Sequence, residues 1–505
     1  MRKRHFARHK ILSTSADDSP SAEKCGYSIR NALRRVFPTD RGGWTVLLLV
    51  TVIQGIVLYN ACRHASNIGY DDKSHITCVK VLAGGHLPTS QETYEFFSPP
   101  LPYLPAVLVY ALGPSTERGL AIALRLAQIT NFAYSGILLW IVLKICRLAR
   151  PGRRDLEILS LLILATLTVY YRTFAFVRGE PLLAMLILAA VHQTLRLTQL
   201  RRAIRWNAIW LGFIAGGAIL SRQWAFFFFP ALFFFLLLRV TRGRESMRRA
   251  TWIFATVCIA ACLVGGWFYI HLKNNEGRIT AFNRPMYRPF SLRHHPRNFY
   301  VSFPLRAMLT NPVRPSFEGQ IIPIFYSDLW GDYWSYFLVY ARNKKSRNWI
   351  NGYNLSLALK EGDKALAEIK TNRNRIARYL GRINAVSSVV SLMLVLGFFW
   401  GAWHLARSIL LSALDTQTES LAWLFIISAS CISGYAFFLI STPTVHGDTI
   451  KPSYLLHVFP LLAILTADLV ISLGSRFPQL KIVLIGSILL TFLHNAPAFF
   501  TRFAG

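Results

Sequence analysis

Apolar runs separated by short polar segments dominate the pattern of the chain. A run of about 18 apolar residues is long enough to cross the hydrocarbon core of a bilayer as a helix. Eleven segments come close to this length or exceed it. The predicted membrane-spanning helices are 44–62, 120–143, 156–174, 179–195, 206–221, 223–239, 251–271, 384–406, 421–441, 453–473 and 482–500.

A twelfth apolar segment, 101–112, is too short to cross the membrane. It carries Pro102 and Pro105, and as a helix it would reach only about 18 Å against a core of roughly 30 Å. We therefore expect it to be re-entrant or interfacial. The pattern as a whole predicts an all-α multi-pass membrane protein with about 11–12 transmembrane helices and a large exoplasmic loop layer.

The distribution of Lys and Arg predicts the orientation, because short cytoplasmic loops carry an excess of these residues. The basic segments are 1–43, 144–155, 196–205 and 239–249. All four are expected on the cytoplasmic side, which leaves the long segments 63–100 and 272–383 on the exoplasmic side. The predicted domains are a cytosolic basic tail (1–43), an N-terminal transmembrane module (44–271) that includes loop 63–100, an exoplasmic loop domain (272–383) and a C-terminal transmembrane module (384–505).

Composition narrows the class of protein further. Lys and Arg number 56 against 24 Asp and Glu, a net charge of +32, yet only 16% of residues are charged and 53% are hydrophobic. Soluble domains carry about 25% charged residues, so the excess of positive charge does not indicate a nucleic-acid partner. The seven cysteines are too few for a disulfide scaffold in 505 residues; Cys62 and Cys78 flank one loop and are the pair that could join.

The first candidate for chemistry is Gly69-Tyr70-Asp71-Asp72-Lys73-Ser74-His75, just after the first predicted span. Asp71 falls near the N-cap of a short helix, where a carboxylate is favoured, and His75 lies four residues on, on the same face. The motif fits a capped interfacial helix. It equally fits a catalytic carboxylate at the membrane surface that takes a proton from an acceptor hydroxyl.

The residues that follow carry a family resemblance. Leu82-Ala83-Gly84-Gly85-His86-Leu87-Pro88 and then Ser98-Pro99-Pro100-Leu101-Pro102-Tyr103 follow the acidic pair. Together they resemble the first exoplasmic loop of the GT-C superfamily of polytopic glycosyltransferases. The protein mannosyltransferase and aminoarabinose transferase groups are closest, and dolichyl-phosphate-glucose glucosyltransferases are also similar.

This resemblance implies a GT-C-like fold and a sugar taken from a polyprenyl-phosphate donor on the exoplasmic side. It implies that Asp71 is the general base and Asp72 its neighbour. Aminoarabinose transferases place Lys before the Pro-Pro pair, whereas this chain has Ser98. That departure argues against this subgroup and its donor.

Three basic or acidic residues near span ends are candidate substrate contacts. Arg178 and Glu180 lie at the start of a span, where buried charges are costly, and the superfamily often has an Arg-x-Asp-like pair in a matching place. Arg222 lies between two spans and could hold the donor phosphate. The alternatives are a local ion pair for Arg178 and Glu180, and an arginine that snorkels to lipid phosphate for Arg222.

Two further groups of residues complete the candidate site, which includes His75. Asp328, Trp330 and Asp332 in the large loop could form a sugar-binding surface or belong to an interfacial aromatic belt. Lys451 and Tyr454 match an Arg/Lys-Tyr motif that the superfamily commonly has near the lipid phosphate; the alternative is interfacial anchoring. No spacing resembles a metal site, so no metal ligand or cofactor is predicted beyond the donor substrate.

We therefore expect an inverting membrane glycosyltransferase whose acceptor is a lipid-linked saccharide, a glycan or a protein. The bacterial inner (plasma) membrane is favoured over the endoplasmic reticulum, with the N-terminus in the cytoplasm. The alternatives are a transporter or flippase of a lipid-linked or anionic substrate, and a non-catalytic scaffold. An enzyme predicts that Asp71, Glu180 and Lys451 line one pocket.

Overall fold

The computed structural model describes residues 40–200, 204–280, 290–343, 349–350, 352, 354–355, 369–371, 373–410, 415–444 and 446–504. The predicted cytosolic tail, 1–43, lies almost entirely outside the described residues.

The N-terminal half of the described chain is helical. Its elements are α2 (Arg41–Arg63), α3 (Asp72–Ala83), η1 (Leu101–Tyr103), α4 (Leu104–Leu112), α5 (Glu117–Ala149), α6 (Arg154–Ala165), α7 (Thr168–Ala175), α8 (Glu180–Leu200), α9 (Ile204–Ile219), η2 (Gln223–Phe227), α10 (Phe228–Thr241), α11 (Met247–Ala261), η3 (Cys262–Gly266) and α12 (Trp267–Glu276). The segment η3 is a short π-helix, and α11, η3 and α12 together form one continuous helix.

The second half adds short elements and then four long helices. They are η4 (Leu292–His294), α13 (Arg297–Val301), α14 (Leu305–Thr310), α15 (Ile321–Trp330), α17 (Arg373–Leu410), α18 (Thr416–Ser441), η6 (Pro452–Leu455), α19 (Phe459–Arg476), α20 (Pro478–Asn495) and η7 (Ala496–Phe499). A small antiparallel sheet of order β2-β1-β3 joins β1 (Ala341–Asn343), β2 (Trp349–Ile350) and β3 (Ile369–Thr371).

The predicted class is confirmed: this is an all-α multi-pass membrane protein apart from the small sheet. Within the described residues, nine helices are long and apolar enough to cross a membrane, and α6 with α7, bent by 68°, makes ten if counted as one span. The remaining predicted span, 206–221, is α9, which has 16 residues and packs between α8 and α11. Segment 101–112 forms η1 and α4, an apolar helix too short to cross.

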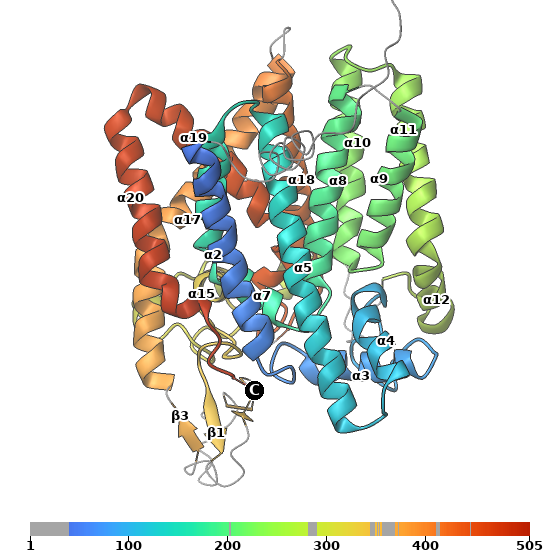
Figure 1. Ribbon diagram of the computed structural model, residues 1–505, viewed down its shortest axis with the longest axis vertical. Coiled ribbons are helices and arrows are strands. Elements are labelled where there is room, and N and C mark those ends of the chain that lie inside the picture. Colours follow the sequence, from blue (N-terminus) through green and yellow to red (C-terminus); the bar gives the residue numbers. More distant parts are fainter. Residues whose placement is uncertain are drawn as a thin grey trace, which may run out of the picture.

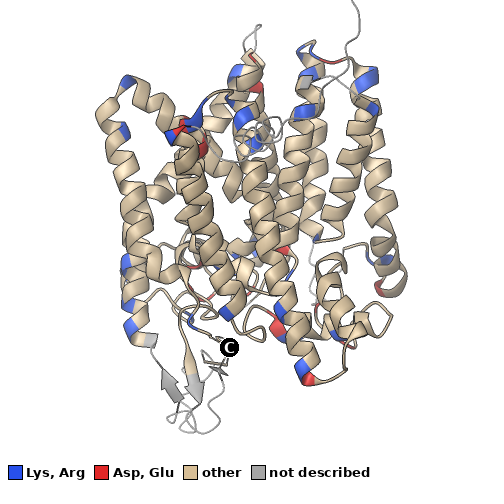
Figure 2. Cartoon of the chain, viewed as in Figure 1, with Lys and Arg blue, Asp and Glu red and all other residues tan. Residues whose placement is uncertain are grey.

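The long helices run side by side, and the irregular segments gather at one end of the bundle (Figure 1). Helices α3 and α4, the sheet and the C-terminal segment all lie at that end. Figure 2 shows most Lys, Arg, Asp and Glu residues near the two ends of the bundle, with a largely uncharged belt between them. This arrangement suits a hydrocarbon core, where an unpaired charge is expensive.

Close packing of α9 on α11 depends on glycines. A Cβ on Gly212 would collide with Ala260 and lie 3.0 Å from the carbonyl oxygen of Val257, and one on Gly216 would collide with Val264. Small residues four apart allow two backbones to approach closely, which is a main source of helix association within membranes. Close packing against α8 and α11 therefore holds the short helix α9 in place.

Replacing Gly212 with Leu should destabilise the bundle by at least about 1 kcal/mol, because the added side chain overpacks the α9–α11 contact. Gly486→Leu is the matched control, since a Cβ on Gly486 in α20 would meet no atom within 4 Å. The measurement is the midpoint of thermal unfolding in detergent. Equal midpoints for the two variants would contradict this packing argument.

Candidate active site

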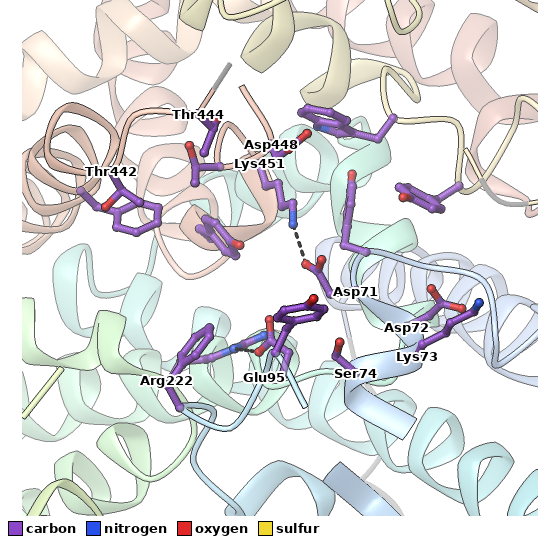
Figure 3. Close-up of a pocket in the computed structure, with 18 of the residues that line it drawn as sticks. Asp71, Asp72, Lys73, Ser74, Glu95, Arg222, Thr442, Thr444, Asp448 and Lys451 are labelled. Atoms are coloured by element: carbon purple, nitrogen blue, oxygen red, sulfur yellow. Dashed lines mark hydrogen bonds and ion pairs between the residues drawn. The ribbon is translucent and has the colours of Figure 1, made fainter. Parts of the chain in front are cut away.

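A pocket of about 490 Å³ opens at the end of the bundle where the irregular segments meet. Five separate stretches of the chain line it. They contribute Tyr70, Asp71, Asp72, Lys73 and Ser74; Tyr94, Glu95 and Phe97; Arg222, Gln223 and Trp224; Arg314, Trp334, Tyr336 and Asn354; and Phe438, Thr442, Thr444, Asp448, Thr449, Lys451 and Tyr454. Figure 3 shows Thr442, Thr444, Asp448 and Lys451 on one side of this pocket and Ser74, Glu95 and Arg222 on the other.

The centre of the pocket is an ion pair between Asp71 and Lys451. The Lys451 ammonium donates to Asp71 Oδ2 at 2.8 Å, across 380 residues of sequence. The Lys451 side chain is 9% exposed and that of Asp71 is 38% exposed, so the carboxylate faces the pocket while the ammonium lies deeper. Figure 3 shows the two side chains pointing toward each other.

The backbone at Asp71 explains how the carboxylate reaches this position. Asp71 is the residue before α3, as predicted, but its side chain makes no capping hydrogen bond. Its φ of 54° and ψ of 29° are in the left-handed region, which costs an ordinary residue roughly 1–2 kcal/mol. Non-glycine residues held in this region concentrate at functional sites. Here the strained turn directs the carboxylate away from the helix and toward Lys451.

The charges of the pocket shift the pKa values of its carboxyl groups in different directions. Burial would raise the pKa of Asp71, but the Lys451 ammonium outweighs it and holds that pKa below its ordinary value. Burial would lower the pKa of Lys451, and Asp71 holds it above its ordinary value. Asp72 forms no ion pair with the residues that the structure describes, and burial raises the pKa of its carboxyl group to about 6. Asp71 therefore stays ionised to a lower pH than Asp72 does.

A second pair of opposite charges lies on the opposite wall. Arg222 Nη1 is 3.0 Å from Glu95 Oε2 and 2.6 Å from Ser98 Oγ. Below it, Glu180 accepts from Arg178 at 2.6 and 2.9 Å and lies 3.2 Å from Arg222. These charges are nearly all buried, but each has an opposite charge beside it, which makes their burial tolerable.

His75 lies beneath the pocket and does not line it. Its Nδ1 lies 2.6 Å from the Tyr103 hydroxyl, and its side chain is 1% exposed. Burial lowers the pKa of His75 to about 4, so the imidazole is neutral at physiological pH. This histidine therefore helps to hold α3 in place and does not face the pocket.

The predicted sugar-binding surface of Asp328, Trp330 and Asp332 is wrong for this structure, because all three are fully buried. Asp328 Oδ2 pairs with Arg172 at 2.8 Å. Trp330 Nε1 donates to Ser391 Oγ at 2.7 Å. These side chains have packing roles that the sequence pattern of aromatic and acidic residues could not distinguish from sugar binding.

Asp332 has a specific structural role. One of its carboxylate oxygens accepts the backbone N–H groups of Phe337, Leu338 and Val339 at 2.6–2.9 Å, and the other accepts that of Tyr336 at 3.0 Å. The carboxylate therefore holds the segment that places Trp334 and Tyr336 in the pocket wall.

The predicted site residues thus divide into two groups. Those that line the pocket are Asp71, Asp72, Arg222, Lys451 and Tyr454; those that do not are His75, Arg178, Glu180, Asp328, Trp330 and Asp332. Glu180 lies behind the pocket and pairs with Arg222 and Arg178, so the expectation that it lines the cavity is wrong. Cys62 and Cys78 are free thiols, so they do not form the disulfide that their positions allowed.

Two residues of this region did not figure in the sequence-based prediction. Glu95 lines the pocket and pairs with Arg222; its position between aromatic residues before the Pro-Pro pair was the available signal. Arg172 is fully buried in α7 and donates to the carbonyl oxygens of Asp328 and Gly331 at 2.7 Å each. The available signal was an arginine inside a predicted span, because charged residues in membrane spans usually have a structural or functional role.

No group of three or more His, Cys, Asp or Glu side chains in the described part of the chain is arranged to hold a metal ion. The pocket therefore offers paired carboxylates and cations, hydroxyl groups and aromatic rings.

One protein-family model matches part of the chain. Residues 98–268 match the model of the dolichyl-phosphate-mannose-protein mannosyltransferase family. This match confirms the resemblance to the GT-C superfamily. The matched segment, about a third of the chain, begins at Ser98 and includes Arg178, Glu180 and Arg222, whereas Asp71 and Lys451 lie outside it. No curated protein sequence matches the chain.

Solved structures show a distant likeness. The archaeal oligosaccharyltransferase AglB from Archaeoglobus fulgidus, in complex with an inhibitory peptide and a dolichol-phosphate, aligns with a TM-score of 0.48 and 10% identity. The alignment covers 90% of this chain and 56% of AglB. ArnT from Cupriavidus metallidurans, bound to undecaprenyl phosphate, aligns with a TM-score of 0.35 and 15% identity over 87% of this chain and 80% of ArnT. At such TM-scores neither alignment establishes a shared function.

Arg172→Met should destabilise the protein by roughly 3–5 kcal/mol, because it leaves the buried Asp328 carboxylate without its charge partner. The measurement is the loss of the folded fraction in detergent, followed by size-exclusion chromatography and thermal unfolding. Arg118→Met, on an exposed surface of α5, is the control and should behave as the unmodified protein. A stable, folded Arg172→Met protein would contradict the structural role assigned to this buried pair.

Proposed function

We propose that this protein transfers a sugar from a polyprenyl-phosphate donor to a hydroxyl-bearing acceptor at the exoplasmic membrane surface. Asp71 is the general base, and Lys451 together with Arg222 contacts the donor phosphate. The observation that supports this most directly is the Asp71–Lys451 pair, in which a carboxylate and an ammonium group lie 2.8 Å apart in one pocket. The plasma membrane of a bacterium is the proposed location, with the N-terminus cytoplasmic.

The arrangement of charge supports an anionic substrate group. Lys451 and Arg222 line the same pocket; Lys451 lies beside Asp71, and Arg222 lies beside Glu95 and Glu180. A phosphate entering between them would gain two charge-assisted contacts, the strongest class of protein hydrogen bond. The Arg222 guanidinium also contacts Ser98 Oγ, so a cation is supplied where this chain has serine in place of lysine before the Pro-Pro pair.

A lipid-facing groove next to the pocket supports a lipid-linked donor. The groove has a volume of about 810 Å³ and is lined by apolar side chains of α10, α17 and α18. Phe437 lines this groove, while its neighbour Phe438 lines the pocket and lies 4.8 Å, ring to ring, from Trp224. A polyprenyl chain in the groove would therefore have its phosphate near the pocket.

The proposed reaction is a single displacement with inversion. The acceptor oxygen attacks the anomeric carbon while its proton passes to the Asp71 carboxylate. The bond between that carbon and the donor phosphate oxygen breaks, and the leaving polyprenyl phosphate keeps the electron pair. Lys451 and Arg222 stabilise the charge that develops on the phosphate, where preorganised cations are most effective.

A transporter or flippase remains the alternative class. A carrier alternates access to a site near the membrane midplane and often has inverted repeats. The charged pocket of this chain lies at one end of the bundle, with the irregular segments (Figure 1). This position favours surface chemistry over transport through the bundle.

Asp71→Asn should reduce sugar transfer by roughly 100- to 10,000-fold, the contribution of a general base. Purified protein would be assayed with a panel of radiolabelled polyprenyl-phosphate sugars and candidate acceptors. Asp155→Asn is the control, because Asp155 pairs with Arg153 and does not line the pocket. Transfer by Asp71→Asn at a rate near that of the unmodified protein would refute the assigned base.

A further inference from the structure

The carboxylate proposed as the catalytic base has a cation directly beside it. Its ion pair with Lys451 is short, and it holds the pKa of Asp71 below the ordinary range even though burial acts in the opposite direction. A carboxylate with so low a pKa is a weak proton acceptor, because base strength falls with pKa. The acceptor hydroxyl would therefore meet an inactive base unless something first removes Lys451.

The surroundings of Lys451 allow such a removal. Its ammonium lies 5.1 Å from the ring centre of Tyr70 and 5.8 Å from that of Tyr454. Cations at this distance from aromatic rings are attracted by the ring electrons. The two rings therefore keep the ammonium at the pocket without the help of Asp71, and the flexible lysine stem can turn between neighbouring acceptors.

The positive charge of Arg178 also favours the release of Lys451 from Asp71. Its guanidinium lies 5.1 and 5.8 Å from the same two rings and is fixed by two hydrogen bonds to Glu180. It repels the Lys451 ammonium and cannot itself leave this position. An anion in the pocket can therefore compete with Asp71 for Lys451, because the two rings hold the ammonium close to both.

Tyr70, by contrast, is buried and anchored by a hydrogen bond. Its hydroxyl donates to Asp328 Oδ2 at 2.9 Å, and Arg172 donates to the same oxygen at 2.8 Å; both charged side chains are fully buried. Tyr70 directly precedes the left-handed turn at Asp71. The turn and the ring are thus fixed together, so an exchange of partners moves Lys451 and leaves the Asp71 carboxylate in place.

We propose that Lys451 keeps Asp71 inactive until a phosphate group occupies the pocket, so that donor binding releases the base before the acceptor is attacked. This inference rests on the proposed function and adds an order to it: donor first, acceptor second. The Tyr70 and Tyr454 rings position Lys451 for the exchange. The arrangement also limits proton removal, and hence unproductive chemistry, in a pocket that holds no donor.

Carboxyl labelling tests this release directly. A carbodiimide with an amine nucleophile would be applied at pH 6 to the full-length protein, and labelling of Asp71 would be quantified by peptide mass spectrometry. A short-chain polyprenyl phosphate is the probe, the uncharged polyprenol is its control, and native mass spectrometry checks that the probe is bound. Asp155 serves as an internal standard, because it forms a 2.8 Å pair with Arg153 and is 35% exposed, much like Asp71.

Polyprenyl phosphate should raise Asp71 labelling at least about tenfold, since above the pKa each unit of increase multiplies the protonated fraction about tenfold. Polyprenol should have no effect, and Asp155 should not respond to either lipid. In Lys451→Met, Asp71 should label strongly without the probe. Flat or reduced labelling of Asp71 with the probe bound, or weak labelling in Lys451→Met, would overturn the proposal.

Two variants test the role of the rings. Tyr454→Leu should require about fivefold more polyprenyl phosphate for half-maximal labelling of Asp71, the loss expected for a cation–ring contact, whereas Tyr454→Phe should match the unmodified protein. Equal requirements for Leu and Phe would exclude the rings from the exchange. Release of Asp71 without sugar transfer from any donor would contradict the proposed function alone, and Asp71-dependent transfer without release would contradict this inference alone.

Discussion

The ion pair between Asp71 and Lys451 joins two distant parts of the chain in one pocket. Asp71 follows the first long helix and Lys451 precedes α19, 380 residues later. Both side chains are surrounded by further charges and rings that would be costly to bury singly. The bundle thus has to bring α3, the start of α8, η2 and η6 together accurately enough to pair these buried charges. This requirement explains why so many short, irregular elements lie at this end of an otherwise regular helical protein (Figure 1).

The pairing of carboxylates with cations in the pocket has a chemical consequence. Four carboxylates and four cations line the pocket, and two of the pairs that they form, Asp71–Lys451 and Glu95–Arg222, lie on opposite walls (Figure 3). Within these two pairs each charge is compensated. An incoming phosphate changes the balance: it attracts both cations and leaves the carboxylates less compensated, hence more basic. Substrate charge can therefore switch the protonation behaviour of the site without a large movement of the backbone.

The sequence predicted the membrane helices well, because a long apolar segment that crosses a bilayer has to satisfy its backbone hydrogen bonds internally and therefore forms a helix. It also placed Asp71 and Lys451 correctly in the pocket, though the role of each remains a prediction. It failed for Asp328, Trp330 and Asp332, since a buried ion pair and a sugar-binding surface use the same residue types. It missed Glu95 and Arg172 because their partners, Arg222 and Asp328, lie more than 100 residues away. Pairing of buried charges depends on tertiary contacts that no local pattern contains.

The most direct test of this account is an experimental structure of the protein with a polyprenyl phosphate bound. The account predicts that the Lys451 ammonium lies within about 3 Å of a phosphate oxygen, the distance of a charge-assisted hydrogen bond. It also predicts that Lys451 has left Asp71, while Tyr70 and the left-handed turn at Asp71 are unchanged. A bound phosphate with the 2.8 Å contact between Asp71 and Lys451 intact would contradict the central claim.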